Sequence, residues 1–382
     1  MRAVSLGFSF EVTGIIMSAY FAGFIVGSLR CVYLIERAGH IRTFAALASV
    51  SSAATLAFIL VESPVAWAIL RAILGFCLAG LYMVTESWLN ERSDNTNRGR
   101  VLSIYMMVSL SSLALGQPLL LLPNPGHFEI FCVASVLISL GLVPVTLTIS
   151  PAPAPPRAQP MALSSLYRVS PLGVAGCFAS GLALGSFWSM APVFCRTLGL
   201  SEGATVIFMV ATILGGLFLL WPIGRLSDRL DRRRVIAMAC AASAAASLAM
   251  VLTGGESMLA LFGLAIAFGG FTFPIYSIAV AHTNDYMEPD DLVSASSALL
   301  LVYGVGAFLG PLVAGLIMGW VGAVGLYALL AGVMTVTVLF ALYRILARAP
   351  LPIEEQEPVV LIPRTTHVAY ELDPRAEPAE ND

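Results

Sequence analysis

Eleven apolar segments, each long enough to cross a lipid bilayer, constrain what this 382-residue chain can fold into. A helix needs roughly 20 apolar residues to traverse the hydrocarbon core, and a spanning helix satisfies its own backbone hydrogen bonds. A soluble chain with 58% hydrophobic and 11% charged residues would expose more apolar surface than water tolerates. We therefore predict an all-α membrane protein, with spanning helices over residues 10–34, 42–62, 65–90, 100–122, 127–148, 169–195, 203–224, 233–253, 257–282, 292–317 and 321–346.

The positions of the arginines predict how these segments are oriented. When the connections are assigned alternately to two sides, and the tail and the intramembrane Arg71 are left out, fifteen arginines fall on one side and only Arg2 and Arg196 on the other. Positively charged connections stay in the cytoplasm. We therefore place the arginine-rich side and the C-terminus inside, which puts Met1 outside.

Two segments without spanning character divide the chain. Residues 149–167 are rich in proline and alanine and predict a cytoplasmic linker. Residues 348–382 are rich in proline and glutamate and predict a disordered acidic cytoplasmic tail. What remains is an N-terminal bundle of five helices over residues 1–148 and a C-terminal bundle of six over residues 168–347.

The two bundles carry glycines at similar positions. Near-equal offsets between halves indicate duplication of a helical unit, and parallel repeats of this size build one large class of transporters. The offsets separate Gly27 from Gly224 by 197 positions, Gly75 from Gly270 by 195, and Gly116 from Gly310 by 194.

A charged motif in the second half names a family. The sequence GRLSDRLDRR at residues 224–233 resembles the GxxxDRxGRR signature of the major facilitator superfamily, with Asp231 where the family has glycine. The first-half copy keeps Gly27 but has Cys31 in place of the aspartate. Other short motifs make the chain similar to the YcaD-like bacterial branch; these are residues 20–23, 86–89, 98–100 and 221–226.

The resemblance implies a fold and a function. It implies two pseudo-symmetric bundles in a bacterial inner (plasma) membrane, and a monomeric secondary transporter that moves a small molecule by alternating access, coupled to protons. The family has twelve helices, whereas eleven are predicted here, so we expect helix 1 to be missing. A start codon assigned too far downstream would explain this, and a true eleven-helix variant is the alternative.

The resemblance also implies a gating role for the two signature loops. Their charged residues would brace neighbouring helix ends, and the contacts would break as the bundles rock. Asp228 could accept bonds from backbone N–H groups at a helix N-terminus, and the arginines could pair with carboxylates. The alternative is positive charge that only sets topology. The gating candidates are Gly27, Arg37, Gly39, Arg42, Gly224, Asp228, Arg229, Arg232 and Arg233.

Ionisable residues inside a membrane are costly and are therefore candidates for substrate binding or coupling. Arg71 could bind an anionic or polar substrate, or it could extend to the outer headgroups. Glu86 could carry a coupling proton, or it could form an ion pair with Arg37, Arg92 or Arg100.

The remaining cavity candidates are uncharged, and each could instead be ordinary packing. They are Tyr82, Tyr105, Gln117, Trp188, Phe271, Tyr276 and Tyr303. The acidic cluster at residues 282–291 is expected to cap the next helix rather than to hold a metal.

A second class of function stays open, since few charges lie inside the predicted spans. The chain could be a non-transporting membrane sensor or scaffold with the same fold, or an inactive truncated form. We expect no enzyme and no cofactor, because the sequence holds no catalytic constellation and no GxxxxGK[ST] motif. No basic domain indicates a nucleic-acid partner.

Overall fold

The computed structural model describes residues 2–93, 97–121, 128–147, 153, 161–253, 257–352, 354, 356, 358–360 and 362–373. Eleven of the helices in these ranges are long and apolar enough to cross a membrane, which confirms the predicted all-α class. The first bundle contains α2 (Phe10–Ala38), α3 (His40–Leu60), α4 (Pro64–Glu91), α5 (Arg98–Gly116), which continues as η1 (Gln117–Leu121), and α6 (Glu129–Leu147). The second contains α8 (Pro171–Thr197), α9 (Glu202–Ser227), α10 (Arg232–Thr253), α11 (Met258–Asn284), α12 (Leu292–Val321) and α13 (Gly325–Ala347).

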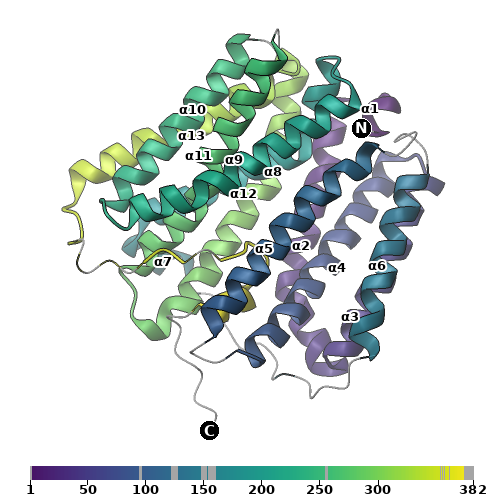
Figure 1. Ribbon diagram of the computed structural model, residues 1–382, viewed down its shortest axis with the longest axis horizontal. Helices are drawn as coiled ribbons and strands as arrows, with labels where there is room; N and C mark the ends of the chain where they lie inside the picture. The colour runs from purple at the N-terminus through teal and green to yellow at the C-terminus, as the bar shows by residue number, and fades with distance from the viewer. Residues whose placement is uncertain are drawn as a thin grey trace.

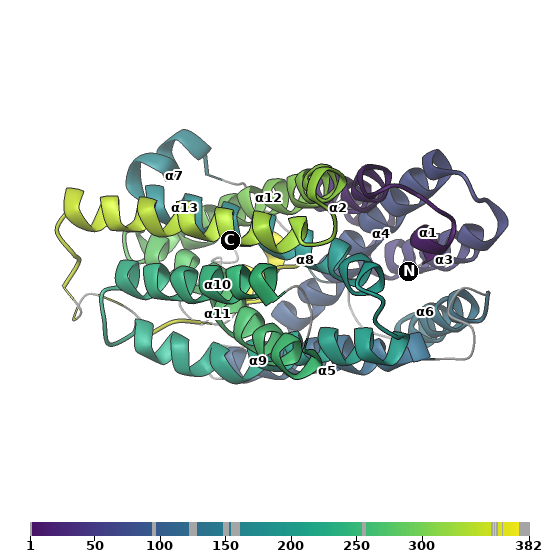
Figure 2. The same cartoon turned by 90° about the horizontal axis from the view of Figure 1, so that it is seen from above.

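The two bundles lie side by side (Figure 1). Seen from above, they meet along two seams, one between α2 and α12 and one between α5 and α9 (Figure 2). We call the end where α2 and α4 terminate and α10 begins the arginine-rich end, because it carries Arg37, Arg92 and Arg232. The opposite end is the arginine-poor end.

The same helix pairs recur in both bundles, as the glycine offsets predicted. Helix α2 packs on α4 as α9 packs on α11, and α3 packs on α6 as α10 packs on α13. Glycines allow the closest of these approaches. A Cβ at Gly23 or Gly75 would lie 1.9 Å from a carbonyl oxygen of the facing helix, and one at Gly215 or Gly269 would lie 2.0 Å from one.

One helix breaks the pseudo-symmetry. Helix α8 packs on α11, α12 and α13, and 83% of its apolar window is buried. In the described part of the first bundle no spanning helix takes the corresponding place, and only the short α1 (Arg2–Ser5) precedes α2. Helix α5, which corresponds to α12, accordingly buries 0% of its apolar window.

Glycines also close the seam between the bundles at the arginine-poor end. A Cβ at Gly14 of α2 would lie 2.4 Å from the carbonyl oxygen of Pro311 in α12, and one at Gly315 of α12 would lie 2.6 Å from that of Phe10. Helices α2 and α12 are therefore in backbone contact at this end.

The C-terminal tail differs from the expectation of disorder. Its described residues run between the bundles (yellow in Figure 1) and form the short helix η4 (His367–Leu372), which contacts α4, α5 and α12. Val368, Tyr370 and Leu372 are at most 1% exposed. These apolar side chains lie within a segment whose composition is otherwise polar. The last nine residues of the predicted tail lie outside the described part.

The predicted linker lies mostly outside the described residues. Its end forms part of the short helix α7 (Leu163–Val169), which leads directly into α8.

The close glycine contacts predict a large difference between two identical substitutions. Gly75→Ala places a methyl group against the backbone of Tyr20 and should destabilise the protein by about 1–3 kcal/mol through overpacking. Gly332→Ala in α13 meets no atom within 4 Å and should be neutral or slightly stabilising. Thermal unfolding in detergent measures both, and equal melting temperatures would contradict the described α2–α4 contact.

Candidate functional site

A cavity of about 510 Å³ lies between the two bundles. Helices α2, α4 and α5 line it from the first bundle, α8, α9, α11 and α12 line it from the second, and the tail closes part of its wall. A volume of this size suits a small organic molecule.

Several sequence candidates meet at this cavity. Tyr82, Trp188 and Tyr303 line it. Tyr276 lies fully buried beside Tyr303, with 5.0 Å between the ring centroids. Phe273, which the sequence analysis did not select, also lines the cavity; its position about one helical turn before the candidate Tyr276 in α11 is the signal that could have found it.

Of the uncharged candidates outside the lining, two have no part in the contacts around the cavity. Gln117 begins η1, towards the arginine-poor end of its bundle, and its amide donates a hydrogen bond to the carbonyl of Leu113 at 3.4 Å. Phe271 packs against the core of the second bundle.

Glu86 is buried in α4 and is bonded to hydroxyl groups. Tyr105 of α5 donates to its carboxylate at 2.8 Å, and the hydroxyls of Thr365 and Thr366 in the tail also donate to it. The alternative of an ion pair with Arg37, Arg92 or Arg100 is not what the structure shows.

Arg71 is not among the residues that line the cavity. Its guanidinium carbon is 5.8 Å from the centroid of the Phe58 ring, and its Nε has no hydrogen-bond partner among the described residues. The structure therefore does not bring Arg71 and Glu86 into one site.

The tail places its own cation in the cavity. The guanidinium carbon of Arg364 lies 5.3 Å from the ring centroid of Tyr276, 5.7 Å from that of Tyr303 and 6.0 Å from that of Phe273. Its Nη2 donates a hydrogen bond to the carbonyl of Phe273 at 2.5 Å. The sequence analysis missed this residue because it assigned the whole tail to disorder.

Helix η4 anchors the tail beyond Arg364. The hydroxyls of Tyr370 and Tyr276 are hydrogen-bonded, and Asn90 of α4 donates to the carboxylate of Glu371 at 2.8 Å. Burial lowers the pKa of His367 to about 4. Burial also raises the pKa of Glu371 to about 7, although the Asn90 hydrogen bond and the charge of Arg98 oppose the shift. The docked tail thus favours the neutral form of both ionisable groups.

These two shifts predict opposite pH dependences for two tail variants. In Glu371→Gln only His367 must lose a proton to dock, so docking should strengthen about tenfold from about pH 5.5 to about pH 7.5. In His367→Gln only Glu371 must gain a proton, so docking should weaken about twentyfold over the same interval. Hydrogen–deuterium exchange of residues 362–373, corrected for the intrinsic effect of pH, measures docking. Slopes of the same sign in both variants would contradict these assignments.

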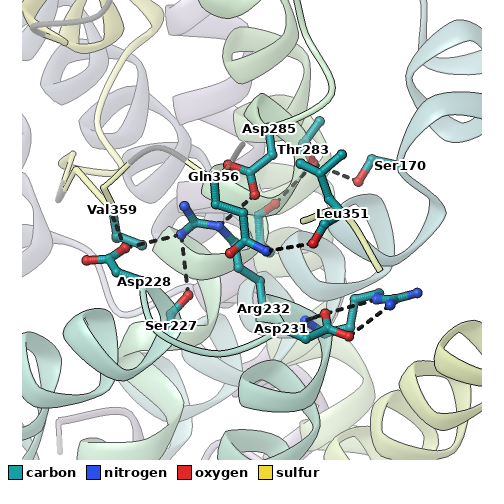
Figure 3. Close-up of polar contacts among 12 residues, drawn as sticks. Ser170, Ser227, Asp228, Asp231, Arg232, Thr283, Asp285, Leu351, Gln356 and Val359 are labelled. Carbon is teal, nitrogen blue, oxygen red and sulfur yellow. Dashed lines mark hydrogen bonds and ion pairs between the residues drawn. The ribbon is translucent and has the colours of Figure 1, made fainter. Parts of the chain in front are cut away.

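The second signature loop forms a buried ionic network at the arginine-rich end (Figure 3). Arg232, at the start of α10, pairs with Asp285, just beyond α11, at 2.6 Å; these side chains are 1% and 2% exposed. Arg232 also lies 3.6 Å from Asp228 and donates to Ser227. Asp228 accepts a hydrogen bond from the backbone N–H of Val359 in the tail at 2.8 Å, rather than from a helix N-terminus.

Asp231 is the residue that departs from the signature, and it pairs with Arg233 at 2.8 Å. It also accepts a bond from the backbone N–H of Arg233 at 3.0 Å, at the start of α10. Although burial favours its neutral form, the hydrogen bonds and charge of Arg233 hold the pKa of Asp231 below its usual value.

The other gating candidates make no such network. Arg229, Arg37 and Arg42 are exposed. Gly27 packs on α4, where a Cβ would lie 2.6 Å from the carbonyl oxygen of Phe76, and Gly39 joins α2 to α3 with φ +80°. Gly224 is buried within α9. The degraded first copy therefore provides a helix contact and a turn, but no ionic brace among the described residues.

Comparison with known proteins identifies the family. The model of the Major Facilitator Superfamily matches residues 2–283 and 222–369, which together cover nearly the whole chain. The chain belongs to the Major Facilitator Superfamily. It is 32% identical over 300 residues to an uncharacterized transporter of this superfamily, YcaD, from Escherichia fergusonii, covering 78% of this chain and 77% of that protein. YcaD of Salmonella typhi is 30% identical over 342 residues, or 89% and 88% of the two chains.

Solved superfamily members share the fold. The nucleoside transporter NupG aligns with a TM-score of 0.70 at 14% identity, covering 89% of this chain and 92% of NupG. A bacterial homologue of the human lysosomal transporter Spinster, in an inward-facing and occupied conformation, aligns with a TM-score of 0.72 at 15% identity, covering 93% and 92%. This superfamily member is therefore a multi-pass membrane protein of a transporter family.

Proposed function

We propose that the protein is a secondary transporter that moves a small molecule through the cavity by alternating access, coupled to protons, in a bacterial inner membrane. The observation that carries this proposal is the cavity itself, which both bundles line. In a protein built of two repeats, rocking of the bundles exposes such a site to each side in turn.

The two ends of the molecule support this motion. At the arginine-poor end α2 and α12 are in backbone contact through Gly14 and Gly315. At the other end the tail lies between the bundles and the ionic network joins α10 to the end of α11. We assign the arginine-rich end to the cytoplasm on the distribution of arginines, which places the tail on that side.

Glu86 is our candidate for the proton carrier, and the network around Arg232 and Asp228 is our candidate for the gate. Within the described spanning helices, Glu86 is the only acid that lies more than one turn from both helix ends. A buried carboxylate next to a substrate cavity can exchange a proton as the cavity changes its exposure.

Transport in proteoliposomes tests this function directly. The full chain is reconstituted with a pH-sensitive dye inside, and solutes are screened for saturable proton movement. Counterflow of a labelled solute without a pH gradient then reports transport without coupling. A solute that moves protons in a saturable manner supports the proposal. A solute that binds the protein but neither moves protons nor shows counterflow would instead support the non-transporting sensor.

A further inference from the structure

We infer that the cavity binds an organic cation, and that Arg364 of the tail occupies the place of this cation until a ligand displaces it. The inference rests on the proposed transport function, because it names the substrate class of the same cavity. It also gives the tail a role as a tethered competitor of the substrate.

The first observation is an aromatic cage. Three rings, from Phe273 and Tyr276 in α11 and Tyr303 in α12, lie within 6.0 Å of the Arg364 guanidinium carbon. Aromatic faces attract cations, and several faces around one cation form a recognised site for organic ammonium groups. The rings belong to the helices, so the cage remains when the tail leaves.

The second observation is the charge of the cavity wall. Among the described lining residues that belong to helices, none is Arg, Lys, Asp or Glu, and the one arginine in the lining is Arg364 of the tail. Glu86 lies behind the wall and receives two of its three side-chain hydrogen bonds from Thr365 and Thr366. When the tail leaves, the cavity therefore loses its cation and uncovers a carboxylate, and both changes favour a cationic ligand.

A tail segment that only filled the cavity would not need an arginine at this position. Burying a guanidinium is costly unless the surroundings compensate for its charge. Within the described residues no carboxylate lies within ion-pair distance of Arg364, so the rings and the Phe273 carbonyl provide that compensation. A site that stabilises one partly buried cation in this way is suited to another organic cation.

The third observation links the tail to the gate. The backbone N–H of Val359 donates to Asp228, which also lies beside Arg232 (Figure 3). A ligand that displaces Arg364 would therefore also loosen a tail contact with the signature loop.

Binding of tritiated tetraphenylphosphonium to the full chain in detergent tests the inference by equilibrium dialysis. Arg364→Gln should bind this cation about tenfold more tightly than the unaltered protein, because the competing guanidinium is gone. Adding Tyr303→Ala to Arg364→Gln should weaken binding about tenfold, whereas Tyr303→Phe keeps the ring face and should not. Arg348→Gln, at the exposed start of the tail, is the matched control and should bind like the unaltered protein.

Tetraphenylborate provides the control for charge, since it has nearly the same shape and the opposite sign. If tetraphenylborate, dialysed in a separate experiment without the phosphonium that it would precipitate, binds as tightly as tetraphenylphosphonium, or if Arg364→Gln does not raise the affinity, the inference is overturned. Hydrogen–deuterium exchange gives a second readout on the unaltered protein. Tetraphenylphosphonium should accelerate exchange in residues 362–373, and unchanged protection at saturating cation would overturn the competition even if the variant fails to fold.

The failures of the two proposals can be told apart. Saturable cation binding at this site without any transport in vesicles would contradict the transport function and support the cation site. Transport of a neutral or anionic solute that tetraphenylphosphonium does not inhibit would sink the cation site and leave the transport function standing.

Discussion

Replacing Glu86 with glutamine is expected to reduce transport driven by a pH gradient by about a hundredfold or more. The side chain is fully buried and lies next to the cavity, and glutamine keeps its size but cannot release a proton. Solute counterflow at saturating concentration, measured without a pH gradient in the same vesicles, should be largely retained because it needs no coupling proton.

Glu91→Gln is the matched control for this prediction. Glu91 ends the same helix and is exposed, so its loss should leave both assays unchanged. Gradient-driven accumulation that survives in Glu86→Gln would show that the proton travels by another route.

Removing the charge of Arg232 is expected to cost about 3–5 kcal/mol of stability, because it breaks the buried ion pair with the Asp285 carboxylate at 2.6 Å. Arg232→Met retains the apolar stem and isolates the charge. Reversible unfolding in mixed detergent micelles, with increasing dodecyl sulfate, measures the change in the free energy of unfolding.

The partner variant tests whether the pair or the position matters. In the double variant Arg232→Met with Asp285→Leu both charges of the buried pair are gone, so most of the loss should be recovered. Arg229→Met, in the same loop but exposed, should change stability by less than about 0.5 kcal/mol. A loss in the double variant equal to that in Arg232→Met would contradict a charge-based explanation.

The sequence predicted the spanning helices well because bilayer thickness imposes a length on each apolar segment. The expected segment 10–34 is part of α2, which continues to Ala38, and the expected segment 292–317 is part of α12, which continues to Val321. Hydropathy marks where a helix leaves the hydrocarbon core, but not where its backbone hydrogen bonding stops. The glycine offsets indicated a duplicated helical unit but not its helix contacts, since a Cβ at Gly116 or Gly224 would meet no atom within 4 Å.

The contacts of the candidate site were beyond reach because their partners lie far apart in the sequence. Asp285 is 53 residues from Arg232, and Thr365 is 279 residues from Glu86. The tail was misjudged because the proline and glutamate around it dominate its composition. A closer signal was present in residues 362–372, where Ile362, Val368, Tyr370 and Leu372 give a short apolar pattern around Arg364.

If Arg364 occupies the cavity as a tethered competitor, it sets a concentration threshold that a free ligand must exceed in order to bind. A binding group held by a short flexible tether has an effective concentration in about the millimolar range, whatever the amount of protein in the membrane. Because Arg364 belongs to the same chain as α13, the inferred competition would be present in every copy of the protein. The transporter would therefore stay silent at low levels of its cation and respond only when the compound accumulates enough to compete with the tail.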